Sequence, residues 1–191
     1  MRDNNNLTAR DLAHHIRSEA RHFGMVLADG PGMAEARELA SQLIGGEVVS
    51  TDTLDRVQSY TGCAVLVARE AGEVAGVLAF VLLNAAGARA ARAGRFDVFN
   101  PATNHMASPD EIVCATYGWG VAASDKPTAK RIGAASEVVN RLMDGVPRYA
   151  RAVTDAGRRF LCDRFGFREL PGSDGLVWLP PPSQRMPAEA A

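Results

Sequence analysis

The segment 121–143 combines residue types that could bind a phosphate group. A strand pattern leads through a polar loop at 124–130 into a helix pattern. The first turn of a helix has amide donors without intrahelical partners, and the helix dipole adds positive potential there. Lys130 and Arg131 supply two cations, and the small residues at 133–135 would let a ligand approach the backbone. These residues alone leave two interpretations open: a phosphate site, or a basic loop that packs a helix onto a sheet.

Two other patterns could bind a cofactor. Residues 118–123 fit Gly-x-Gly-x-x-Ala, but a dinucleotide site requires a helix to begin at once, and 124–127 break the chain instead. His15, Glu19 and His22 lie on one face of a predicted helix, without a further ligand to complete a metal site. The three cysteines lack zinc spacing. We therefore expect neither a nicotinamide cofactor nor a metal.

Composition narrows the classes of protein. The chain has 191 residues, of which 47% are hydrophobic and 23% charged, as in one globular domain with at most an appendage. The net charge of −1 predicts no general attraction to nucleic acid or to an anionic membrane. The longest apolar run, 74–83, is far shorter than the about 20 residues that span a bilayer. The residues after Met1 lack the apolar core of a secretory signal, and the cysteines are odd in number, so we expect a cytoplasmic protein.

The periodicity of apolar residues predicts the elements that would position these groups. Helices are expected over about 8–23, 33–44, 53–61, 131–143 and 155–165. Strands are expected over about 25–28, 63–69, 74–83, 112–123, 148–154, 167–170 and 176–179. This order predicts an α+β fold with a mixed α/β sheet.

Several local signals refine these boundaries. Thr8 with Asp11 predicts the start of the first helix, and Asp52 is a candidate N-cap of the third. Residues 29–32 have the composition of a turn, and the long connection 84–110 suggests a function or partial disorder. Gly118 and its near neighbour Gly120 indicate a bulge or a close backbone approach.

The order of elements resembles the GNAT superfamily of acyl-CoA-dependent N-acyltransferases, over about residues 33–179. Residues 63–83 resemble its second and third strands. Residues 148–167, RYARAVTDAGRRFLCDRFGF, resemble its fifth strand, the helix that follows and a closing Gly-Phe. The chain is identified as a divergent member because its candidate pyrophosphate-binding loop, which ends at Gly133, matches the family's Arg/Gln-x-x-Gly-x-Gly/Ala motif in position but only partly in residue type.

The resemblance implies a central, mostly antiparallel sheet flanked by helices. This domain would span 25–179, with an N-terminal helical extension at 1–24 and a Pro-rich flexible tail at 180–191. It also implies that acyl-CoA, the expected cosubstrate, lies between the strands at 112–123 and 148–154, with its diphosphate on the amides of 129–134. Aligning the last glycine of the loop with Gly133 puts Thr128 at the Arg/Gln position and Arg131 at the first glycine. The implied cofactor-binding residues are Val121, Ala123, Thr128, Ala129, Lys130, Arg131, Ile132, Gly133 and Ala134.

The resemblance further implies catalytic groups. A carboxylate near the fourth strand commonly accepts the proton of the attacking amine, which nominates Glu111, and Tyr117 lies further along that strand. Cys162 stands where the family often has a tyrosine that protonates the leaving thiolate. The alternatives are a solvated carboxylate at 111 and a small buried hydrophobe at 162. A backbone N–H near Val121 would stabilise the oxyanion.

Two functions therefore stay open at the level of sequence. The first is an N-acetyltransferase or other N-acyltransferase, in which an amine attacks the thioester of acyl-CoA directly. The second is a non-catalytic GNAT-like domain that senses acyl-CoA or binds another protein. The resemblance leaves the amine unidentified, and two sheet edges and the N-terminal helix leave a homodimer open.

Overall fold

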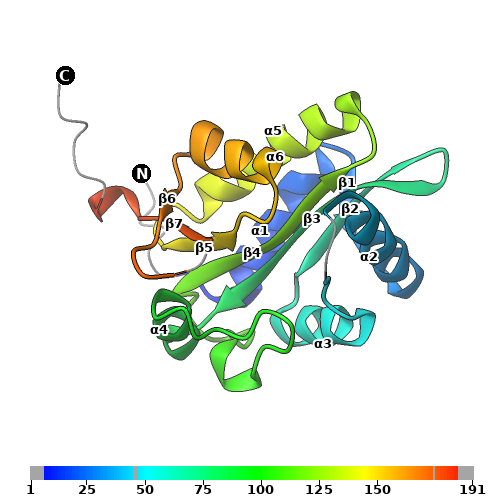
Figure 1. Cartoon of the computed structure of the whole chain (residues 1–191). Helices are drawn as coiled ribbons and strands as arrows, with labels where there is room; N and C mark the ends of the chain where they lie inside the picture. The colour runs from blue at the N-terminus through cyan, green and yellow to red at the C-terminus, as the bar shows by residue number, and fades with distance from the viewer. Residues whose placement is uncertain (1–6, 45–46, 174, 185–191) are drawn as a thin grey trace.

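The fold is a seven-stranded sheet with helices on both faces (Figure 1), in the order β1-β2-β3-β4-β5-β7-β6. The computed structural model describes residues 7–44, 47–173 and 175–184. The strands are β1 (Met25–Leu27), β2 (Val65–Glu70), β3 (Glu73–Leu83), β4 (Ala115–Ala123), β5 (Arg148–Arg151), β6 (Arg168–Glu169) and β7 (Leu176–Leu179). The helices are α1 (Ala9–Arg21), α2 (Gly30–Ile44), α3 (Thr51–Thr61), α4 (Ala85–Arg92), α5 (Lys126–Leu142) and α6 (Asp155–Arg158), with short turns η2 (Thr103–His105), η3 (Arg159–Arg164) and η4 (Pro182–Gln184).

The sheet confirms the predicted mixed α/β class. All neighbouring strands are antiparallel except β4 and β5, which run parallel. The predicted hairpin is β2 and β3, and β3 is buried from Val74 to its end. A strand covered on both faces needs a nearly continuous apolar run, which is the pattern of 74–83.

Two helical layers cover the sheet. On one face α1 and α5 pack on Leu78, Phe80 and other β-strand side chains. On the other face α2, α3 and α4 pack on the strand side chains that point to that face, which include Val77 and Ala79. Side chains of a strand point alternately to its two faces, so the sequence of β3 supplies both cores at once.

The first helix, α1, is built into the main core. Thr8 caps it by accepting a hydrogen bond from the Asp11 N–H, as the sequence predicted. Its buried residues Leu12 and Ile16 belong to the same apolar cluster as Ile132 of α5. Residues 9–21 of the expected N-terminal extension thus form one of the two helices that cover this face.

Three helices begin earlier than the sequence predicted. The Gly32 N–H donates to Asp29 Oδ1 at 2.8 Å, so 29–32 form the capped start of α2 and not a separate turn. Ser50, not Asp52, caps α3. Asp125 caps α5, which begins at Lys126 and takes up most of the expected loop at 124–130. In α2 and α5 a proline lies in the first turn, where its missing N–H costs no intrahelical bond.

The connection 84–110 folds against the sheet. Asn84 caps α4 by accepting hydrogen bonds from the amides of Ala86 and Gly87. A Cβ on Gly87 would overlap the His105 carbonyl oxygen, so α4 and η2 approach each other closely at this glycine. In the expected tail at 180–191, Pro180 and Pro181 are buried, and residues 185–191 lie outside the described residues. Residues 1–6 and the predicted helix stop at 45–46 also lie outside them.

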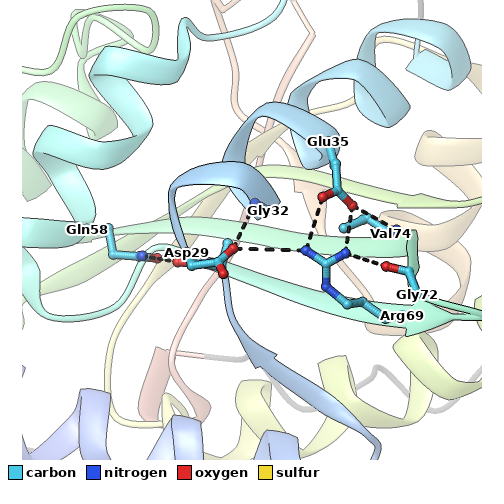
Figure 2. A network of polar contacts seen from close by, with 8 residues as sticks. Asp29, Gly32, Glu35, Gln58, Arg69, Gly72 and Val74 are labelled. Atoms are coloured by element: carbon cyan, nitrogen blue, oxygen red, sulfur yellow. Dashed lines mark hydrogen bonds and ion pairs between the residues drawn. The ribbon is translucent and has the colours of Figure 1, made fainter.

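A polar network fixes α2 to the β2–β3 hairpin (Figure 2). The Arg69 guanidinium donates to both carboxylate oxygens of Glu35, at 2.7 and 3.2 Å, and to the Gly72 carbonyl oxygen at 2.6 Å. Glu35 also accepts from the Val74 N–H at 3.2 Å. Helix α2 contributes to one wall of the cleft described below, so this network positions that wall.

Candidate functional site

The parallel strands β4 and β5 separate after a short stretch of pairing. Residues Thr116–Gly118 pair with Arg148–Ala150, and β4 then continues to Ala123 beside β3 alone. One edge of β4 beyond Gly118 therefore has no strand partner, and its alternate backbone N–H and C=O groups face the gap. These are the two strands between which the resemblance placed acyl-CoA.

A bulge in β4 lies where the strands separate. Ala79 pairs with Gly120 and Phe80 with Gly118, so Trp119 is the extra residue on β4. This confirms the bulge that Gly118 and Gly120 indicated. The indole N–H of Trp119 donates to the Val98 carbonyl oxygen at 2.9 Å, which ties the bulge to the 84–110 connection.

A cavity of about 610 Å³ occupies the gap between β4 and β5. Its lining comes from both sides of the sheet, including Ala36 and Leu43 on α2 and Ile132 and Ser136 on α5. The lining is mostly apolar, and its size and character fit a site for a small organic molecule. The cleft that the acyl-CoA hypothesis requires is therefore present.

Exposed apolar side chains gather around this cavity. Leu43, Phe99, Val121 and Val153 are 48%, 42%, 37% and 60% exposed, and all four line it. Single exposed apolar residues are ordinary, but a concentration at one cavity marks a binding site. The arrangement favours a ligand with a substantial apolar part.

The residues that line the cavity include several polar ones, among them Ser136 and two tyrosines. Ser136 lies on the sheet side of α5, 4% exposed, and within the described residues its hydroxyl has no hydrogen-bond partner. Burial raises the pKa of Tyr117, an effect that the nearby Arg151 opposes. Burial likewise raises the pKa of Tyr149. Both phenols therefore keep their protons at neutral pH and can donate hydrogen bonds.

Arg148 holds together the end of the cleft where β4 and β5 are paired. Its side chain is 3% exposed and donates to Asp144 Oδ1 at 3.0 Å and to the Asn140 carbonyl oxygen. These contacts connect β5 to the last turn of α5. The width of the cleft at this end is therefore set by a buried charged group and its partners.

The residues predicted to bind the cofactor divide into two groups. Val121, Ala123, Ala129 and Ile132 line the cavity, as does the predicted catalytic residue Tyr117. The remaining predicted residues do not line it: Thr128, Lys130, Arg131, Gly133, Ala134, Glu111 and Cys162.

Glu111 is engaged at the start of α1. Its carboxylate accepts from the Ser108 N–H at 2.7 Å, and this hydrogen bond holds its pKa below the usual value. Its carbonyl oxygen accepts from the Ala9 N–H at 2.9 Å. Glu111 therefore contacts a turn and the start of α1, and it does not line the cavity.

Cys162 lies in η3, a single π-helical turn. It is partly buried and packs on a small cluster with Ala150, Phe167 and Val177. This environment agrees with the alternative in which the side chain fills space as a small hydrophobe.

The amides predicted to hold a diphosphate are engaged within α5. The Thr128 N–H donates to Asp125 Oδ1 at 2.8 Å, and the Ala129 N–H donates to the Asp125 carbonyl oxygen at 2.9 Å. Pro127 has no N–H. Residues 130–134 lie inside the helix, where each amide bonds to the carbonyl four residues earlier. The expected row of unpaired amides at 129–134 is therefore absent from this helix, because α5 starts at Lys126.

Two arginines beside α5 form ion pairs. Arg131 forms an ion pair with Glu70, at 2.7 Å, and Arg164 forms one with Glu137, at 2.6 Å. A Cβ on Gly133 would lie 3.4 Å from Arg164 Cζ, so this glycine faces a guanidinium and not open space.

Sequence reasoning missed Ser136 and three of the exposed apolar residues that line the cavity, Leu43, Phe99 and Val153. A serine on the apolar stripe of a helix is the signal that could have indicated Ser136, since a buried hydroxyl needs a partner. No group of three or more His, Cys, Asp or Glu side chains is placed to hold a metal ion in 7–44, 47–173 or 175–184. Within the same described part of the chain, none of the helices has the length and apolar character to cross a bilayer.

The solved structures that are similar to this chain include two that carry a family name. One is the GphF GNAT-like decarboxylase in complex with isobutyryl-CoA, with 13% identity over 71% of this chain and 69% of that chain, and a TM-score of 0.42. The other is a GNAT family acetyltransferase from Brucella melitensis in complex with acetyl-CoA, with 16% identity over 82% of this chain and 86% of that chain, and a TM-score of 0.41. No protein-family model and no curated protein matches the chain. Both structures carry the name of the superfamily that the sequence resembles, but at these TM-scores they carry no argument about activity.

Proposed function

We propose that the chain binds an acyl thioester in the cleft between β4 and β5 and transfers the acyl group to an amine. The observation that carries this proposal is the separation of the two strands after Gly118, which leaves a strand edge unpaired along an apolar cavity. The pantetheine arm of an acyl thioester such as acyl-CoA is extended and contains two amides. An extended chain with amides can add to an unpaired strand edge through main-chain hydrogen bonds.

The proposed reaction is one direct step. The amine nitrogen attacks the thioester carbonyl carbon, the carbon–sulfur bond breaks, and the proton lost by the amine balances the proton gained by the thiolate. The bulge at Trp119 would present a backbone N–H to the carbonyl oxygen as negative charge develops. Tyr117, a protonated phenol in the cavity wall, would donate a hydrogen bond to the sulfur. Positioning of the two reactants supplies most of the rate.

A second candidate is an acyl-thioester-binding domain without turnover. It is favoured by the positions of Glu111 and Cys162, neither of which lines the cavity. Neither residue is therefore placed to exchange a proton with an amine or a thiolate bound in the cavity.

Calorimetric titration with acetyl-CoA and octanoyl-CoA, paired with thiol release over a panel of amines, tests both candidates. Binding with thiol release supports the transferase, and binding without release by any amine supports the second candidate. Absence of binding refutes both. In a transferase, Tyr117→Phe should lower turnover about tenfold with little change in thioester affinity, while Tyr60→Phe, outside the cavity, should not.

A cavity-filling variant tests the location of the site. Gly120 lies in the wall, and a Cβ there would already touch Ile44 Cδ1 at 3.4 Å. Gly120→Leu should therefore remove thioester binding. Gly30→Leu is the matched control, because a Cβ on this exposed glycine meets nothing within 4 Å. Equal affinity of the two variants would place the ligand elsewhere.

A further inference from the structure

We propose that the chain recognises the acyl-pantetheine half of its thioester and does not bind the nucleotide diphosphate on α5. This inference rests on the proposed function and specifies its substrate class: acyl thioesters of pantetheine, with or without a nucleotide. It is carried by the way the first turns of α5 are capped, packed and charged.

The helix start is closed by the chain's own carboxylate. Asp125 Oδ1 accepts from the Thr128 N–H at 2.8 Å, and Asp125 Oδ2 accepts from the Thr128 hydroxyl at 3.1 Å. A bound phosphate needs these same donors. Because Pro127 has no N–H and the Ala129 N–H donates to the Asp125 carbonyl oxygen, the positions 127–129 offer no amide to a ligand.

The Asp125 carboxylate also places a negative charge at this helix start, beside the exposed Lys126 and Lys130. The hydrogen bond from the Thr128 backbone N–H holds the pKa of Asp125 below its usual value, so the carboxylate is ionised at neutral pH. An ionised carboxylate therefore stands where a diphosphate would have to lie, and the two like charges repel each other.

The space beside the first turns is filled. A Cβ on Gly76 of β3 would lie 2.7 Å from Thr128 Cγ2, which shows how closely α5 rests on the sheet. On another side Gly133 is buried beneath the Arg164 guanidinium. The residues present at 128–134 therefore do not fit a diphosphate.

The cavity itself offers contacts to the other half of such a ligand. Four exposed apolar side chains surround it, namely Leu43, Phe99, Val121 and Val153. Ser136 adds a buried hydroxyl that lacks a partner within the described residues. A buried hydroxyl without a hydrogen bond is costly, and a polar atom of the extended arm would satisfy it. We assign Ser136 as a contact to that arm.

Calorimetry with two probes, octanoyl-CoA and S-octanoyl-pantetheine, tests the inference. The two dissociation constants should agree within about threefold, since the protein has no binding site for the nucleotide half. Lys130→Glu reverses the exposed cation next to the expected diphosphate site and should leave both constants unchanged. A preference for octanoyl-CoA above about threefold would overturn the inference and leave the proposed function standing, and loss of that preference in Lys130→Glu would place the nucleotide beside α5. Binding of neither probe would overturn both.

A second variant tests the assignment of Ser136. Ser136→Ala should weaken both probes by the same factor, about three- to tenfold, because it removes one hydrogen bond to their shared arm. Ser18→Ala, on the exposed face of α1, is the matched control. Circular dichroism of each variant shows that the fold is retained. Unchanged affinity of Ser136→Ala for both probes would overturn the assignment.

Discussion

Gly76 lies on β3 directly beneath the first turns of α5, and its replacement by alanine tests how the helix is seated. A Cβ at this position would lie 2.7 Å from Thr128 Cγ2 and closer still to Ile132 Cδ1. Ordinary contacts between carbon atoms are about 3.5–4.0 Å. Gly76→Ala therefore requires α5 to move away by about 1 Å or Ile132 to adopt another rotamer.

The expected loss of stability follows from two opposing effects. Overpacking a filled core costs about 1–3 kcal/mol, and replacing a strand glycine by alanine returns about 0.5–1 kcal/mol. Thr128 yields little, because its side chain is β-branched and its hydroxyl donates to Asp125. We expect the free energy of unfolding to fall by about 1–2 kcal/mol and the Tm by about 2–8 °C.

Urea unfolding followed by circular dichroism measures this loss. Gly30→Ala is the control, since a Cβ there meets nothing within 4 Å, and it should change the stability by less than about 0.5 kcal/mol. Adding Ile132→Val, which removes the Cδ1 atom, should recover part of the loss caused by Gly76→Ala, although alone it costs about 0.5–1.5 kcal/mol. If Gly76→Ala is as stable as Gly30→Ala, α5 does not rest on β3 at the described distance.

Three further changes test other parts of the structure. Glu35→Gln should lower the free energy of unfolding by about 0.5–1 kcal/mol, and by less in high salt, because its partly exposed pair with Arg69 is screened; an equal loss at all salt concentrations would contradict this. Burial raises the pKa of the Cys63 thiol to about 12, so at about pH 8 a thiol reagent should modify the other two cysteines first and Cys63 only on unfolding, as mass spectrometry can show. The lowered pKa of Asp125 adds stability that is present above the ordinary aspartate pKa of 3.8 and is lost as the pH falls through the lower pKa of the folded state. Asp125→Asn should therefore lose less stability than the wild type on acidification, and parallel acid unfolding curves would show that the carboxylate contributes nothing.

The sequence predicted the sheet well, because its signals are local. The apolar run 74–83 indicated a buried strand, and the glycines at 118 and 120 indicated the bulge around Trp119. Helix starts were predicted less well. In 29–32 and 124–127 an acidic residue followed closely by proline was interpreted as a turn or loop, although the same residues cap and open a helix.

The candidate site was only partly predictable. Tyr117 and Val121 line the cavity, and their predicted roles in catalysis and cofactor binding stay predictions. Leu43 and Val153 come from distant segments that meet only in the folded chain, so no local pattern could have joined them. The register of α5 was not predicted: the helix starts at Lys126 and places 130–134 inside it, whereas the sequence predicted a loop as far as 130.

The outer strands of the sheet have a consequence for the behaviour of the protein in concentrated solution. The edge strands β1 and β6 have 3 and 2 residues, so neither edge of the sheet has many backbone groups that could pair with a strand of another molecule. Within the described residues, β4 beyond Gly118 presents a longer free edge, and it lies inside the cleft. A bound thioester arm would cover this edge, so the empty protein should be the form that self-associates into aggregates, and saturation with ligand should keep it monodisperse.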